Sequence, residues 1–135
     1  MGSLRLPPIH LLQRVIGDDW TIEAHRTAGT SSEWENPVVT MRRGPDRTAA
    51  LVATSLDGTI ILDGVNDPSA NLVVPATNFT AGDLYIVIRR AVTLQAPPMQ
   101  MWVELSVDSV ALGGRQTVGF YTFPAVEQIA VESLP

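Results

Sequence analysis

The clearest hydrophobic pattern in the chain runs from Met99 to Val107. Every second residue of this segment is apolar, and Gln, Trp, Glu and Ser fill the positions between. Successive side chains of a strand point to opposite faces, so this alternation predicts a strand with one buried and one wetter face. The segment from Leu84 to Val92 alternates in the same way. Pro97 and Pro98, which lie between the two segments, supply no ladder donor. We therefore expect two long strands that pair antiparallel at the centre of the fold.

Shorter apolar runs, separated by turn residues, predict additional strands along the rest of the chain. Trp20, Ile22 and Ala24 share the inward phase of the first of these strands. Asp57-Gly58 is a strong hairpin signal, because Gly readily adopts the positive φ of a primed turn. Gly113-Gly114 is predicted to turn the chain into the strand over residues 116–123. The pattern predicts about eight strands and no internal helix, as in a β-sandwich. The other predicted strands cover residues 38–43, 49–56, 59–62, 72–74 and 116–123.

Both ends of the chain are apolar. A short helix is predicted after the prolines at positions 7 and 8, and its apolar residues are Ile9, Leu11, Leu12 and Val15. Apolar groups at a terminus must pack either on the domain's own core or on a neighbouring subunit. The segment from Pro124 to Leu134 permits a short helix or a last edge strand. We therefore divide the chain into an N-terminal arm (1–16), a sandwich domain (17–123) and a C-terminal tail (124–135).

Composition narrows the functional classes. The 135 residues, of which 45% are hydrophobic, suffice for one domain with a sizeable core. Cysteine is absent, which excludes disulfides and thiolate metal sites, and every basic residue is arginine. A net charge of −5 argues against a nucleic-acid binder, which normally needs a basic face. No apolar stretch approaches the length that spans a bilayer, and no secretory signal is evident. We expect synthesis in the cytoplasm and no binding to nucleic acid or membrane.

The polar residues form no catalytic signature. His10 and His25 lie in different segments, and no G-x-S-x-G nucleophile elbow accompanies them. Glu23 and Glu104 both occupy outward strand phases, and nothing in the pattern brings their carboxylates together. A predicted loop from Asp63 to Asp67 offers oxygen ligands for calcium, but its spacing differs from that of an EF-hand, and the same residues build tight turns. We therefore expect no catalytic, cofactor-binding or metal-binding residue, and no enzymatic activity.

Aromatic and apolar side chains are the better candidates for a binding site. Trp34 lies in a polar loop and Trp102 on an outward strand phase, where a partner protein can bind them. The apolar residues of the arm and the tail are the other candidates. Exposed tryptophans beside polar groups also suit stacking on sugar rings, so a carbohydrate-binding module is the alternative. The predicted interface residues are Ile9, Leu11, Leu12, Trp34, Trp102 and Ile129.

Four short motifs occur in an order that is known from other domains. Gly17-Asp18-Asp19-Trp20-Thr21-Ile22 is a strand that follows a Gly-Asp turn, and Val38-Val39-Thr40-Met41-Arg42 is a strand that ends in Met-Arg. Leu72-Val73-Val74-Pro75 is an apolar strand with a terminal proline, and Thr80-Ala81-Gly82-Asp83-Leu84-Tyr85 approaches the next strand. In this order residues 17–107 resemble the immunoglobulin-like domains of tailed-phage and prophage virion proteins, in particular the N-terminal domain of baseplate upper proteins.

The resemblance implies both a fold and a role. The fold is an all-β, immunoglobulin-like antiparallel β-sandwich of about 7–9 strands with short terminal arms. The role is that of a non-enzymatic structural or assembly module of a phage or prophage particle, associated with its tail or baseplate. Such a module acts through protein–protein contacts with copies of itself, as a homo-oligomer, and with other virion proteins.

Overall fold

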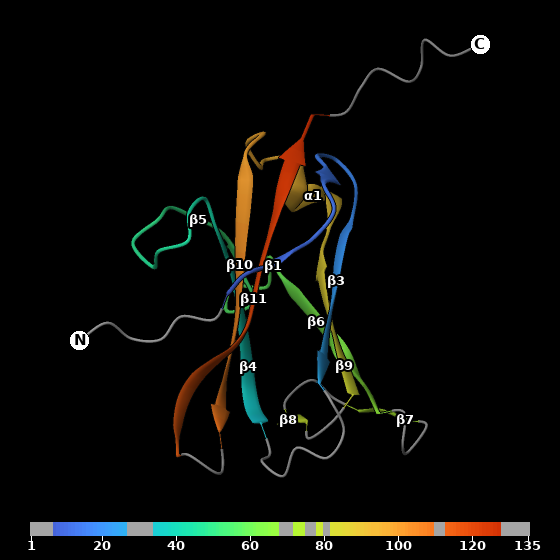
Figure 1. The fold of residues 1–135 in the computed structure, drawn as a ribbon. Coiled ribbons are helices and arrows are strands. Elements are labelled where there is room, and N and C mark those ends of the chain that lie inside the picture. The colour runs from blue at the N-terminus through green and yellow to red at the C-terminus, as the bar shows by residue number, and fades with distance from the viewer. Residues whose placement is uncertain are drawn as a thin grey trace.

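Two β-sheets pack face to face in the computed structural model of this chain (Figure 1). The structure describes residues 7–26, 34–67, 72–74, 78–79, 82–109 and 113–127. Almost all of these residues lie in strands or in the turns that join strands. A single helical turn, α1 (Arg90–Thr93), is the one helix among them.

The larger sheet has seven strands in the order β1-β11-β10-β4-β5, where β2 also pairs with β11 and β8 with β4. Its long strands pair antiparallel, whereas β1 and β2 both run parallel to β11. Its strands are β1 (Ile9–His10), β2 (Arg14–Val15), β4 (Trp34–Arg42), β5 (Leu51–Thr54), β8 (Asn78–Phe79), β10 (Gln100–Ser109) and β11 (Gly114–Val126).

The smaller sheet has four antiparallel strands in the order β3-β9-β6-β7. They are β3 (Trp20–Arg26), β6 (Ile61–Asp67), β7 (Leu72–Val74) and β9 (Gly82–Ile88). The strand orders of the two sheets identify the topology. In an immunoglobulin domain one sheet carries strands B, E and D, and the other carries G, F, C and C′. Strands β3-β9-β6 and β11-β10-β4-β5 reproduce these two orders. The predicted fold, an immunoglobulin-like antiparallel β-sandwich, is confirmed.

The core lies between the two sheets and follows the predicted phases. Trp20, Ile22 and Ala24 of β3 are buried, as are the alternate residues of β10 from Met101 to Val107. The largest buried side chain, Trp20, makes an edge-on contact with Phe123 of β11, with ring centroids 5.5 Å apart. This contact joins the two sheets. Burial of each large apolar side chain contributes about 1.5–3 kcal/mol, so these alternating residues drive the two sheets together.

The helix predicted in the N-terminal arm is wrong, because this segment forms β1 and β2 along β11. The amide of Leu11 donates to the carbonyl of Thr122, and the amide of Ile16 donates to that of Val126, both at 2.9 Å. The indole of Trp20 donates to the carbonyl of Val15 at 2.8 Å. An extended arm satisfies its own backbone and the otherwise open edge of β11, which a helix of the same residues would leave unpaired.

Arg14 fixes the second half of the arm. Its guanidinium lies 5.5 Å from the ring centroid of Phe123 and donates to the carbonyl of Leu12 at 2.6 Å. Partial burial lowers the pKa of Arg14, although the side chain remains charged. Strands therefore extend from Ile9 to Val126, on both sides of the 17–123 span expected for the sandwich. The tail is a strand as far as Val126, and residues 128–135 lie outside the described residues.

The predicted pairing of the two central strands is wrong. β9 lies in the four-stranded sheet and β10 in the seven-stranded sheet, so the chain crosses the sandwich between them. Helix α1 makes this crossing. Buried Thr93 donates from its hydroxyl to the carbonyl of Asp18 at 2.7 Å and accepts the amide of Gly17 at 3.2 Å. The carboxylate of Asp19 accepts the amide of Arg90 at 2.7 Å, so the turn before β3 holds the helix in place.

Two predicted turns have different outcomes. Gly58 has a φ of 82°, and the Asp57 carboxylate accepts both the amide and the hydroxyl of Thr59. The turn exists, but the hairpin prediction is wrong, because β5 and β6 lie in different sheets. At the other turn, Gly113 has a φ of 68° and joins β10 and β11 as antiparallel neighbours, as expected. The loop predicted over Asp63–Asp67 is also wrong, because these residues belong to β6.

Candidate interaction surface

The solvent-facing side of the seven-stranded sheet is the candidate site, and we call it the outer face. Paired residues of neighbouring strands point to the same side of a sheet. The strand register therefore places one residue from each of five strands in a row on this face. The row runs from β1 through β11, β10 and β4 to β5 and consists of His10, Thr122, Trp102, Arg42 and Leu51.

An aromatic pair occupies the middle of the outer face. Trp102 of β10 and Phe120 of β11 stack with ring centroids 5.7 Å apart and planes inclined by 30°. Phe120 is 7% exposed, whereas Trp102 is only half-buried. Such a pair stabilises the fold by about 0.5–1.5 kcal/mol in addition to the effect of burying its apolar area. Phe120 thus holds the indole in one orientation and leaves part of it at the surface.

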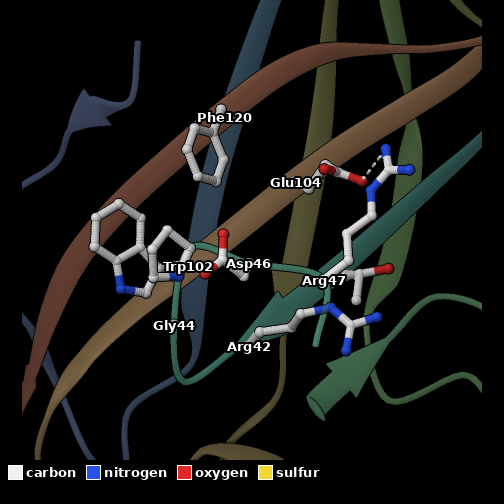
Figure 2. Close-up of a pocket in the computed structure, with 9 residues that line it drawn as sticks. Arg42, Gly44, Asp46, Arg47, Trp102, Glu104 and Phe120 are labelled. Atoms are coloured by element: carbon white, nitrogen blue, oxygen red, sulfur yellow. Dashed lines mark hydrogen bonds and ion pairs between the residues drawn. The ribbon is translucent and has the colours of Figure 1, made fainter. Parts of the chain in front are cut away.

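Arg47 brings a charge onto this face from the connection between β4 and β5. Its guanidinium lies 3.3 Å from the carboxylate of Glu104 on β10 and 3.2 Å from the hydroxyl of Thr117 on β11. Figure 2 shows the Arg47 side chain reaching Glu104 beside the aromatic pair. Because Arg47 is 73% exposed, this ion pair adds at most about 1 kcal/mol to stability. Its main effect is to fix opposite charges at known positions on the surface.

A shallow hollow lies between the aromatic pair and this loop. Its volume is about 20 Å³, which is room for about one water molecule. The guanidinium of Arg42 donates to the carbonyl of Ala49 at 3.0 Å and so fixes the loop that forms one wall. Figure 2 shows the Asp46 carboxylate between Trp102 and Arg47. The hollow is lined by Thr40, Arg42, Gly44, Pro45, Asp46, Arg47, Trp102, Glu104 and Phe120. It is too small to enclose a substrate and suits contact with a surface.

A second charged group is fixed where β4, β10 and β11 meet near Asp108. The Asp108 carboxylate accepts the side-chain amide of Asn36 at 3.0 Å and the guanidinium of Arg115 at 3.1 Å. These bonds, first that from Asn36 and then that from Arg115, lower the pKa of Asp108. Arg115 also donates to the carbonyl of Asn36 at 2.7 Å. One arginine therefore links three strands, and the left-handed φ of 49° at Asn36 lies beside a register shift between β4 and β10.

The structure places the six predicted interface residues in different environments. Trp102 lies on the outer face. In the arm, Ile9 is 54% exposed and Leu12 is 84% exposed, but Leu11 packs partly buried against the core of its own domain. The predicted loop position of Trp34 is wrong, because its backbone begins β4 and pairs there with Ser109 and Phe79. Ile129 lies outside the described residues.

Several residues of the outer face were not predicted. Phe120 and Arg47 belong to it through pairing of β10 with β11 and through the path of the β4–β5 loop, and neither follows from local alternation. Conversely, the structure separates residues that were considered together. Glu23 and Glu104 lie in different sheets, as do the backbones of His10 and His25. Arg89, which follows β9, lies 3.6 Å from the carboxylate of Asp19 before β3.

Within the described ranges, no group of three or more His, Asp or Glu side chains is placed to hold a metal ion. No described helix is long and apolar enough to cross a membrane. Both findings concern only the part of the chain that the structure describes.

Comparison with known proteins identifies similar folds. No protein-family model matches the chain, and no curated protein matches it. A family 123 glycoside hydrolase from Clostridium perfringens is similar over 93% of this chain, with 14% identity and a TM-score of 0.55. The matched part is 24% of the hydrolase chain. Because identity is this low, the likeness shows the fold alone.

Two other solved structures match this chain over the whole of their own length. The natural cytotoxicity receptor NKp44 matches over 91% of this chain, with 10% identity and a TM-score of 0.45. A β subunit of voltage-gated sodium channels, studied for its cell-adhesive interactions, matches over 93% of this chain, with 8% identity and a TM-score of 0.46.

Proposed function

We propose that this protein is a non-enzymatic interaction module that binds a partner protein through its outer face, with Trp102 as the anchor. The observation that carries the proposal is the Trp102–Phe120 stack. Tryptophans at binding surfaces contribute most when a rigid surrounding holds them and excludes water from their edges. Phe120 supplies that rigidity here, and the Arg47–Glu104 pair supplies a polar rim.

The chemistry of the face supports binding over catalysis. Catalytic groups work in enclosed sites, where water is excluded and pKa values are shifted by burial. The hollow beside Trp102 admits about one water molecule, and the ionisable side chains around it lie at the surface. Opposite charges fixed by hydrogen bonds instead suit recognition of a complementary surface, where they set orientation and the rate of association.

We further propose that the partner belongs to a phage or prophage particle, in its tail or baseplate. This assignment rests on the motif resemblance of residues 17–107 and is a prediction about context. Contacts between copies of the chain fit the same role, because Ile9 and Leu12 expose apolar surface on an arm that is itself firmly paired to β11. An apolar side chain on a rigid strand loses little entropy on binding.

Co-purification tests the proposal. The tagged chain is expressed in the organism that encodes it, and its complexes are isolated from lysates and from released particles. Trp102→Ala is expected to reduce recovery of the specific partner at least tenfold while the variant remains folded. Tyr85→Ala is the matched control, because Tyr85 is a half-buried aromatic of the other sheet. Equal recovery with both variants would contradict the outer-face proposal, and a partner that is not a virion protein would contradict the particle assignment.

A carbohydrate is the second candidate ligand. Trp102 lies beside Arg42, Asp46 and Glu104 in one hollow, and a sugar ring needs such a combination of an indole and hydrogen-bonding groups. Tryptophan fluorescence during titration with a broad glycan panel tests this alternative. A saturable change that Trp102→Ala abolishes would favour a sugar, whereas no response to any glycan would remove it.

A further inference from the structure

The longest edge strand in the described structure is β3. It borders the four-stranded sheet, and over all seven of its residues it pairs with β9 without a register shift. The other strands at the ends of the two sheet orders are short: β5 has four residues, β7 three, and β1 and β2 two each. Because β1 and β2 are so short, β11 also has no described strand beside it over Gly114–Phe120. Proteins usually protect a long edge with proline, a bulge or a covering segment, because it presents unpaired N–H and C=O groups. β3 contains neither a proline nor a bulge.

The free hydrogen-bonding groups of β3 can be identified. In an antiparallel pair, the N–H and C=O of one residue point to the same side, and successive residues alternate sides. The carbonyl of Thr21 accepts the guanidinium of Arg14, which lies in β2, so Thr21 faces the open side. Glu23 and His25 then face the open side with their backbone groups. Among the described residues, none hydrogen-bonds the backbone of Glu23 or His25 on that side.

We infer that this edge accepts residues 128–135 of a second copy of the chain as an added β-strand. The segment reads QIAVESLP, in which Ile129 and Val131 alternate with Ala130 and Glu132. β-branched residues at every second position favour a strand with one apolar face. Eight extended residues span about 26 Å, which is enough to cover the open positions of β3. The added strand would place Ile129 and Val131 over the end of the core, level with Ile22 and Ala24.

The structure favours the segment of a second copy over the same copy's own segment. The chain leaves β11 at Val126, which pairs with Val15 of β2. Nearby, Arg14 of β2 donates to the outward-facing carbonyl of Thr21 in β3. The chain's own segment would have to cross β2. β11 and β3 run in opposite directions, and β11 ends near the start of β3 (Figure 1). The segment would therefore have to turn back after β11, and it would then run parallel to β3. A second copy can approach in the antiparallel orientation, which is the more stable pairing. The resulting contact is head-to-tail and is separate from the outer face.

Amide exchange on the full chain tests this inference. The amide of Glu23 is expected to exchange at least tenfold more slowly as protein concentration rises, in step with an increase in solution mass above 14.6 kDa. Ala130→Pro is expected to abolish both effects, because Ala130 lies opposite Glu23 in this register and proline removes the N–H that it would donate to β3. Leu4→Pro is the matched control at the other end of the chain and is expected to change neither.

Three results would overturn the inference. Glu23 exchange that is fast and independent of concentration would show that the edge stays open. Slow exchange at all concentrations would indicate pairing within one copy. Loss of protection in Leu4→Pro but not in Ala130→Pro would make the N-terminal segment the added strand. Trp102→Ala separates this contact from the proposed function, because it is expected to impair partner binding and leave Glu23 protection unchanged.

Discussion

Replacement of Gly119 by alanine tests the packing on the core side of the seven-stranded sheet. Gly119 lies in β11 opposite Leu105, on the side that faces the core. A Cβ at Gly119 would lie 3.0 Å from both Cε2 and the hydroxyl oxygen of Tyr121, and 3.2 Å from the Cβ of Leu105. These distances are shorter than van der Waals contact. The ring of Tyr121 therefore lies against the glycine, and an added methyl group requires Tyr121 and Leu105 to shift.

The expected loss of stability follows from the side chains that must move. Leu105 is 2% exposed and Tyr121 is 7% exposed, so neither side chain can shift into solvent without losing buried area. Overpacking of this kind costs about 1–3 kcal/mol. For a domain of this size, that corresponds to a decrease in Tm of roughly 3–10 °C. Burial also raises the pKa of the Tyr121 phenol, so a variant that exposes the ring should bring this pKa back toward its ordinary value.

Two other glycines provide matched controls. A Cβ at Gly114 meets nothing within 4 Å, so Gly114→Ala is expected to be neutral or slightly stabilising. Gly113 also has open space but a φ of 68°, so Gly113→Ala should cost about 1 kcal/mol through backbone strain alone. Thermal and urea unfolding of the three variants, followed by circular dichroism, makes the comparison. If Gly119→Ala is as stable as Gly114→Ala, the close packing of Tyr121 on Gly119 is wrong.

Three further predictions concern the arm, the core and acid stability. Trp20→Phe should lower the free energy of unfolding in urea by about 1–3 kcal/mol, because it leaves a cavity and removes the indole hydrogen bond to Val15. Leu12→Asp should leave the Tm unchanged, since this side chain is exposed, whereas Leu11→Asp should lower it clearly; equal effects would refute the arm's placement. The pKa of Asp108 is lowered in the folded state. The Asp108 carboxylate therefore stabilises the fold at pH values above the ordinary aspartate pKa of 3.8, and this stabilisation is lost as the pH falls below 3.8. Asp108→Asn should therefore flatten the decline in urea midpoint over this acid range.

Local alternation in the sequence predicts which side of each strand is buried. The inward phase of Trp20, Ile22 and Ala24, and that of β10, is confirmed because period-2 alternation is a property of a single strand. The same alternation says nothing about which strand lies alongside. β9 and β10 are equally regular, yet they lie in opposite sheets, because the short segment between them can turn back or cross over with the same residues.

The structure of the arm and the composition of the outer face depend on contacts between residues far apart in the sequence, which local patterns do not predict. β1 and β2 are strands because the edge of β11 offers them hydrogen bonds. The spacing of apolar residues within the arm does not indicate that this edge lies beside it. Trp102 was predicted as a surface aromatic from its phase alone. Its partner Phe120 and the Arg47–Glu104 pair become neighbours only through the register of β10 with β11 and the path of the loop after β4.

The most direct test of the central claim is oxidative footprinting of Trp102, in the isolated chain and in its native complex. Half-buried Trp102 should be oxidised readily in the isolated chain and protected at least fivefold in the complex. Tyr85, which is half-buried on the opposite sheet, should be modified equally in both. Protection of Trp102 alone is the result we predict. Equal oxidation of Trp102 in the isolated chain and in the complex would contradict binding through the outer face.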